Sequence, residues 1–138
     1  MRALATAIFS RLSGDATLTA MLGKTATVPS IFTKRPVPTA AGYPLVIVGP
    51  IVSDQHADAI SSVGRQIAID VSVHGKAADQ YNATVDAAER IRALLHRSKV
   101  TPAGWQSVVI VCSGPIDAPA EPDEISRVVT ANVRLHQV

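Results

Sequence analysis

The spacing of apolar residues near the amino end predicts two short helices. Over residues 3–12 the apolar positions recur every four residues, which places one apolar stripe on an amphipathic helix, formed by Leu4, Ile8 and Leu12. Asp15 can cap a second helix, because its carboxylate accepts hydrogen bonds from the unpaired amides of a first turn. We expect that helix to end with Gly23 as its C-cap and to bury Leu18, Met21 and Leu22.

A third and longer helix is predicted over residues 77–97. Its apolar positions recur every three or four residues and are Tyr81, Val85, Ala88, Ile91 and Leu95. On the polar side, Asp86 and Arg90 lie one turn apart and are expected to form an ion pair.

Strict alternation predicts a half-buried strand over residues 66–74. Ile67, Ile69, Val71 and Val73 would face the core, whereas Gln66, Ala68, Asp70, Ser72 and His74 would face outward. Residues 43–52 are rich in β-branched side chains at successive positions, so both faces of this second strand should be covered. Pro50 has no amide hydrogen and predicts a bulge, a break or an edge position there.

The rest of the chain predicts shorter strands and longer connections. Residues 25–38 should hold a short edge strand that runs into a proline-containing loop, and residues 53–64 should form a long loop. Residues 107–112 and 127–136 read as strands, joined by a turn-rich link over residues 113–125. The predicted class is therefore α+β: a mostly antiparallel sheet packed by one long helix, with an N-terminal pair of short helices.

Composition agrees with a single folded unit. The chain has 138 residues, 47% of them apolar and 17% charged, which suffices for one sizeable core and predicts one domain over residues 1–138. The apolar run at residues 43–52 is too short to cross a membrane. The first nine residues imitate a short signal peptide, but Arg11 interrupts the apolar stretch, and we read them as mature sequence.

The charge of the chain argues against nucleic-acid binding as its main function. The formal net charge is only +2, and basic residues lack the interleaved aromatics typical of such surfaces, since aromatics make up 4% of the chain. The distribution is nevertheless uneven: the basic excess lies in the first 42 residues, and the remainder is slightly acidic.

The chemistry-bearing residues do not form a catalytic pattern. Cys112 is the single cysteine, so no disulfide or CxxC pair can form within the chain, and its apolar neighbours predict a buried thiol with a raised pKa. No glycine pattern fits a phosphate loop, and no metal-binding spacing occurs among the four histidines, which are His56, His74, His96 and His136. We therefore predict no catalytic, cofactor-binding or metal-binding residues and no cofactor.

Two further groups of charged residues could form binding sites, but ordinary surface positions explain both. Asp54, His56 and Asp58 fall within five residues and could act as metal ligands, but a plain surface loop is favoured. A cationic group near the end of the long helix could bind phosphate, but a solvated helix end that complements the helix dipole is favoured; its members are Arg90, Arg92, Arg97 and Lys99.

Three segments are unusual for a compact domain: the long loop at residues 53–64, the basic segment at 34–38 and the acidic link at 117–124. Segments of opposite charge at opposite ends of a molecule would suit a head-to-tail contact between identical subunits, and such contacts can close into rings. This reading predicts an assembly protein.

The order and spacing of the motifs resemble the small tail-completion proteins, or tail terminators, of long-tailed bacteriophages, prophages and gene transfer agents. The resemblance covers nearly the whole chain. The most distinctive motif is the strand Gly64-Arg65-Gln66-Ile67-Ala68-Ile69-Asp70-Val71. The others are Asp15-Ala16-x-Leu18-x-x-Met21-Leu22-Gly23, Tyr43-Pro44-Leu45-Val46, the helix at 87–95 and Arg127-Val128-Val129.

The resemblance implies a non-enzymatic virion protein, assembled in the bacterial cytoplasm and located at the head–tail junction. It would form a six-membered ring on the tail tube protein, end tube growth, contact a neck or head-completion protein and pass DNA through its lumen without specific binding. Residues 53–64 would be a contact element, whereas the acidic link departs from the family pattern. Two alternatives remain: a neck or head-closure subunit, and a small ligand-binding or hydrolytic α+β domain.

The alternating strand yields a stability prediction. If Ile69 faces the core, Ile69→Ala should lower the free energy of unfolding by roughly 2 to 5 kcal/mol, because the substitution leaves a cavity. Chemical denaturation measures this loss. A loss below about 0.5 kcal/mol, the level of surface substitutions, would show that the strand faces are reversed.

Overall fold

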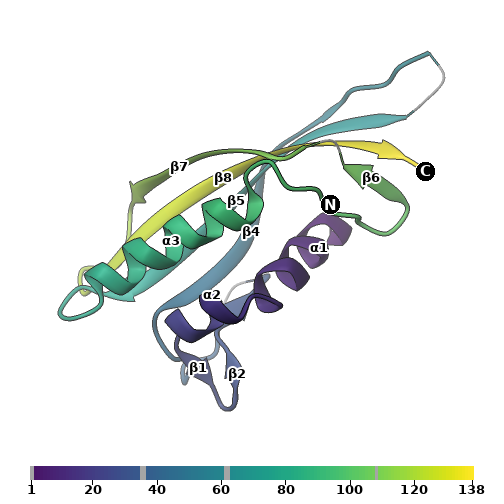
Figure 1. The fold of residues 1–138 in the computed structure, drawn as a ribbon. Coiled ribbons are helices and arrows are strands. Elements are labelled where there is room, and N and C mark those ends of the chain that lie inside the picture. Colours follow the sequence, from purple (N-terminus) through teal and green to yellow (C-terminus); the bar gives the residue numbers. More distant parts are fainter. Residues whose placement is uncertain (1, 35–36, 61–62, 108) are drawn as a thin grey trace.

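A computed structural model of the protein describes residues 2–34, 37–60, 63–107 and 109–138. The chain has an α+β fold in which helices cover one face of a twisted, mostly antiparallel sheet (Figure 1). The elements are α1 (Arg2–Ser13), α2 (Ala16–Met21), β1 (Lys24–Thr25), β2 (Val28–Pro29), β3 (Ile31–Phe32), β4 (Leu45–His56), β5 (Gly64–Lys76), α3 (Tyr81–Leu95), β6 (Trp105–Ser107), β7 (Val111–Ala118) and β8 (Glu124–Gln137).

Strands β5 and β8 form the centre of the main sheet, whose order is β3-β4-β5-β8-β6, with β7 also paired to β8. The ladder between β5 and β8 is antiparallel and includes all 13 residues of β5. β4 flanks β5, while β6 and β7 share the other side of β8. β3 pairs in parallel with Val46 and Ile47 of β4.

The core lies between this sheet and the helices. The inward residues of β5, which are Ile67, Ile69, Val71 and Val73, are all 0% exposed, as alternation predicted. β8 adds Val129, Ala131, Val133 and Leu135, and the stripe predicted for α1 is equally buried. α3 approaches the sheet closely because its buried face carries small residues: a Cβ at Gly75 would overlap the hydroxyl of Thr84.

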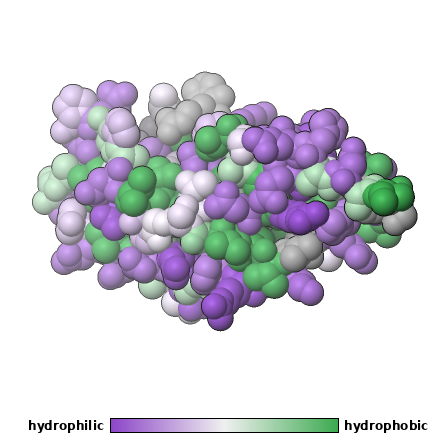
Figure 2. Space-filling model, turned by 90° about the horizontal axis from the view of Figure 1, so that it is seen from above, coloured by the Kyte–Doolittle hydropathy of each residue, from purple (hydrophilic) through white to green (hydrophobic). Residues whose placement is uncertain are grey.

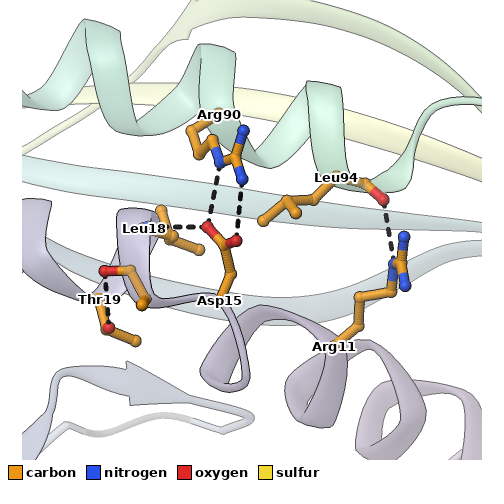
Figure 3. Close-up of polar contacts among 7 residues, drawn as sticks. Arg11, Asp15, Leu18, Thr19, Arg90 and Leu94 are labelled. Carbon is orange, nitrogen blue, oxygen red and sulfur yellow. Dashed lines mark hydrogen bonds and ion pairs between the residues drawn. The ribbon is translucent and has the colours of Figure 1, made fainter.

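Asp15 links the N-terminal helix pair, α1 and α2, to helix α3 (Figure 3). Its carboxylate caps α2, as predicted, by accepting a hydrogen bond of 2.8 Å from the Leu18 amide. The same group binds the Arg90 guanidinium of α3 through bonds of 3.0 and 2.9 Å. The predicted ion pair between Asp86 and Arg90 is therefore wrong. The Arg90 guanidinium instead binds the Asp15 carboxylate, which lies at the N-terminus of α2. The Arg90 bond holds the pKa of Asp15 below its ordinary value of 3.8.

Several local predictions for the helices need correction. α2 ends at Met21 and its C-cap is Leu22 rather than Gly23. The glycine is needed instead for close packing, since a Cβ there would overlap the backbone of Gly42 and Tyr43. In α3, Tyr81 is 56% exposed, and Thr84 occupies the buried position one turn further on.

The strands run further than polarity suggested. The loop predicted at residues 53–64 is shorter in the structure, because β4 continues to His56 and β5 begins at Gly64, so the loop is the connection of an antiparallel hairpin. Cross-strand hydrogen bonds satisfy the backbone here, although few side chains are apolar. The bulge expected near Pro50 is confirmed by register shifts between Val48 and Ser53.

The carboxyl-terminal predictions are also partly wrong. Residues 107–112 do not form one strand; they span the end of β6 and the start of β7, and residue 108 lies outside the described residues. The turn-rich link predicted at 113–125 is shorter in the structure, because β7 runs to Ala118 and pairs with β8. Of the predicted edge region, β3 is confirmed, but residues 24–29 contribute the separate β1–β2 pair, and residues 35 and 36 lie outside the described residues. On β5, Ser72 and His74, which alternate with the core-facing residues as predicted, are nevertheless buried, each with an exposed fraction of 8%.

Two substitutions of Asp15 separate its cap from its ion pair. Asp15→Asn keeps an oxygen that can cap α2 but removes the charge, and Asp15→Ala removes both, so the alanine variant should be less stable by about a further 1 kcal/mol. The lowered pKa means that the charge stabilises the fold fully above the unfolded-state pKa, and that this stabilisation is lost as pH falls through the folded-state pKa.

Urea unfolding at several pH values measures both effects. The stability difference between wild type and Asp15→Asn should be largest near neutral pH and should shrink below pH 4 or so. A difference that stays constant down to pH 2 or so, where both carboxyl states would be protonated, would contradict an ionic role for Asp15.

Candidate assembly surfaces

The β4–β5 hairpin is a projection of the sheet. It extends beyond the helices at one end of the molecule (Figure 1). Its strands remain paired out to His56 and Arg65, and the Ala57 amide donates to the Gly64 carbonyl at 2.9 Å. Its exposed apolar residues are Val52, Ile60 and Val63, with exposed fractions of 59%, 109% and 46%. Exposed apolar side chains on a projecting hairpin are typical of a contact surface.

The hairpin also accounts for the cluster of Asp54, His56 and Asp58. Asp54 binds the Arg65 guanidinium across the strands, and Asp58 accepts a hydrogen bond of 3.0 Å from the Gly64 amide. These carboxylates therefore stabilise the hairpin. Among the described residues, no group of three His, Cys, Asp or Glu side chains is placed to hold a metal ion.

The sheet face opposite the helices is open. Figure 2, which views the molecule from above, shows separate hydrophobic patches among hydrophilic side chains. Strand β7, at the sheet margin, contributes Val111 and Ile116, which are 53% and 63% exposed. Between the central strands, the Thr130 hydroxyl donates to Asp70 at 2.7 Å. An antiparallel sheet can present such a mixed face to water or to another subunit.

The residues of the predicted cationic group have separate roles. Arg90 binds Asp15, and the backbone amide of Arg97 donates to the Ile110 carbonyl at 2.8 Å. Lys99 instead belongs to a groove of about 660 Å³ between α1 and the segment at residues 99–103.

This α1 groove carries positive charge from Arg2, Arg11 and Lys99. Small apolar residues and hydroxyls form much of the rest of its lining, among them Ala3, Ala7, Val100, Thr6 and Ser10. Sequence reasoning missed it because Lys99 is distant in sequence from the other two. The available signal was a polar stripe on the first helix, where Arg2, Thr6 and Ser10 recur every four residues.

The position of Cys112 disfavours reaction of its thiol. It is 6% exposed within the core, as predicted, and burial raises the pKa of its thiol to about 11, although the charge of Arg92 acts in the opposite direction. A thiol with this pKa is almost entirely protonated at neutral pH and is a poor nucleophile.

Comparison with known proteins places these surfaces in context. The family model described as "Tail completion protein gp17" matches residues 6–133. No curated protein gives a significant match to the chain. Among solved structures, a chain of the "Virion of native gene transfer agent (GTA) particle" is 19% identical, with a TM-score of 0.79, and the match covers 96% of this chain and 94% of that chain.

A second solved chain is 16% identical, with a TM-score of 0.50 and coverage of 99% of this chain and 94% of that chain. At these identities the likenesses show a shared fold. Among the described residues, no helix is long and apolar enough to span a membrane.

The environment of Cys112 yields a chemical prediction. In the folded protein at pH 8, its thiol should resist alkylation by iodoacetamide, because it is both buried and protonated. In denaturant it should react at the rate of a free cysteine. Mass spectrometry of timed samples measures both rates, and equal rates in the two states would contradict the buried position.

Proposed function

We propose, from the premise that this chain belongs to the tail completion protein gp17 family, that it is a structural protein of a phage-like virion. In this proposal it completes the tail and carries no enzymatic activity. The single observation that carries the proposal is the family match over residues 6–133, and the fold shared with a chain of a gene transfer agent virion supports it.

The proposed action is to cap the tail tube. Identical subunits form a six-membered ring on the last ring of tube protein, prevent further tube subunits from adding and supply the tail-side part of the head–tail junction. DNA passes through the lumen of this ring without sequence-specific contact. The chain acts as one domain over residues 1–138, because helices and sheet share one core.

The exposed surfaces support an assembly role. The hairpin bears Ile60 and Val52, whose apolar atoms remain in water unless a neighbouring protein covers them. A ring needs at least two unlike contact surfaces on each subunit, and a further surface must meet the tube. The hairpin, the open sheet face and the α1 groove are separate surfaces that can serve these contacts together.

Tube capping can be tested by electron microscopy with purified tail tubes. Negative-stain images and mass determination should show rings of the protein at tube ends, and tubes polymerised in its presence should be shorter than tubes grown alone. Binding to a head-side adaptor but not to tubes would place the protein in the neck instead. Binding to neither would contradict both structural roles.

Hairpin variants make this test specific. Val52→Ser and Ile60→Ser should change the free energy of unfolding by less than about 0.5 kcal/mol, because both side chains are exposed, yet reduce tube capping. Val28→Ser is a matched control, because Val28 is 60% exposed but lies in β2, outside the hairpin. Capping that is unchanged in the hairpin variants, or lost equally in the control, would exclude the hairpin as the contact element.

A further inference from the structure

The α1 groove holds positive charge that the fold does not neutralise. Arg2, Arg11 and Lys99 converge on it, and no ion pair found in the described part of the chain involves any of the three. Arg11 is held in place because its Nε donates to the Leu94 carbonyl at 3.1 Å (Figure 3). The groove is therefore a prepared surface for a negatively charged group.

A second surface carries the opposite charge. The turn between β7 and β8, residues 119–123, is exposed at every position and contains Glu121 and Asp123. Pro119 and Pro122 restrict its backbone, so it loses little conformational freedom on binding. Its carboxyl end is fixed because the Ala77 amide donates to the Asp123 carbonyl at 2.9 Å. Asp123 forms an exposed ion pair of 3.7 Å with Lys76, whereas Glu121 takes part in no ion pair found among the described residues.

These two surfaces cannot neutralise each other within one subunit. The acidic turn is anchored beside the start of α3, whereas Lys99 follows its end. The 15 residues of α3 separate them by about 22 Å. That distance exceeds the screening length of roughly 8 Å at physiological ionic strength, so the attraction between them within one chain is weak.

We propose that the acidic β7–β8 turn of one copy binds in the α1 groove of a second copy. This inference rests on the proposed ring function and identifies one of its subunit contacts. Each chain provides one acidic turn and one basic groove, so the contact is heterologous and can continue from copy to copy until a ring closes. The small apolar lining, with Ala3, Ala7 and Val100, suits a narrow segment that contains Pro119 and Ala120.

The chemistry of the groove favours this occupant over DNA. None of the described residues that line it is aromatic, so they offer bases no surface on which to stack. Three converging cations match a compact acidic segment better than they match the regular phosphate spacing of a duplex, which is usually bound along an extended basic stripe.

Charge reversal with exchange of partners tests the contact. A groove variant, Arg2→Glu with Lys99→Glu, and a turn variant, Glu121→Lys with Asp123→Lys, alter exposed side chains. Alone, each variant should require a concentration about tenfold or more above wild type for assembly, because like charges then face each other. A mixture of the two variants should assemble as alternating subunits. A chain with all four substitutions should also assemble.

For the groove variant, the control is Lys24→Glu with Arg97→Glu, which makes the same change in net charge at two exposed positions that do not line the α1 groove. It should assemble like wild type. Thermal unfolding of every variant checks that the fold is intact, and Arg11 is left unchanged so that its bond to Leu94 persists. Native mass spectrometry and light scattering, in solution and with tail tubes, measure assembly.

The outcomes separate this inference from the proposed function. Single variants that assemble like wild type would overturn the contact while leaving tube capping intact. Loss of assembly that neither the mixture nor the four-substitution chain restores would also overturn it, and would indicate that the groove binds another acidic partner or DNA. Wild-type rings that ignore tube ends would contradict the proposed function but not the contact. Wild type that stays monomeric both in solution and with tubes would overturn both.

Discussion

The antiparallel ladder between β5 and β8 is the constraint on which the rest of the structure depends. It includes all 13 residues of β5, and the alternation of the two strands gives every inward side chain an opposite partner, such as Ile69 with Ala131. A shift by one residue would exchange the buried and exposed faces of both strands, so burial fixes the register. α3 packs on this ladder, and the Asp15–Arg90 ion pair fixes the N-terminal helices to α3.

The ladder also explains which elements the sequence could predict. Where one face of an element is buried and the other is exposed to solvent, the alternation of apolar and polar side chains predicts the element directly. The predictions for β5, β8 and α1 rested on this pattern. Where only hydrogen bonds to a neighbouring strand keep the chain extended, the pattern of apolar and polar residues does not predict a strand. Residues 53–56 and 113–118 are strands because their neighbours in β5 and β8 offer hydrogen bonds. Their own polar and proline residues suggested a loop and a link.

The candidate surfaces divide in the same way. Composition and spacing were enough to predict a buried Cys112, whereas the contacts of Asp54 and Asp58 within the hairpin depend on strand pairing that the sequence did not reveal. The α1 groove could not be predicted, because Lys99 joins Arg2 and Arg11 only after α3 and the connection that follows it return the chain to α1. The partner of Arg90 was missed for the same reason, since Asp15 is 75 positions away in sequence. Local spacing cannot reveal such pairs.

A fold that covers only one face of its sheet leaves much of its surface available for assembly. A stable ring does not require any one of the contacts on that surface to be strong. Exposed ion pairs contribute little each, so a single contact between an acidic turn and a basic groove would be weak and easily reversed. In a closed ring, the last contact forms between ends that are already held together, and the effective concentration of each site is high. Contacts that are individually weak can therefore give a stable ring, while free subunits avoid uncontrolled association before a template is present.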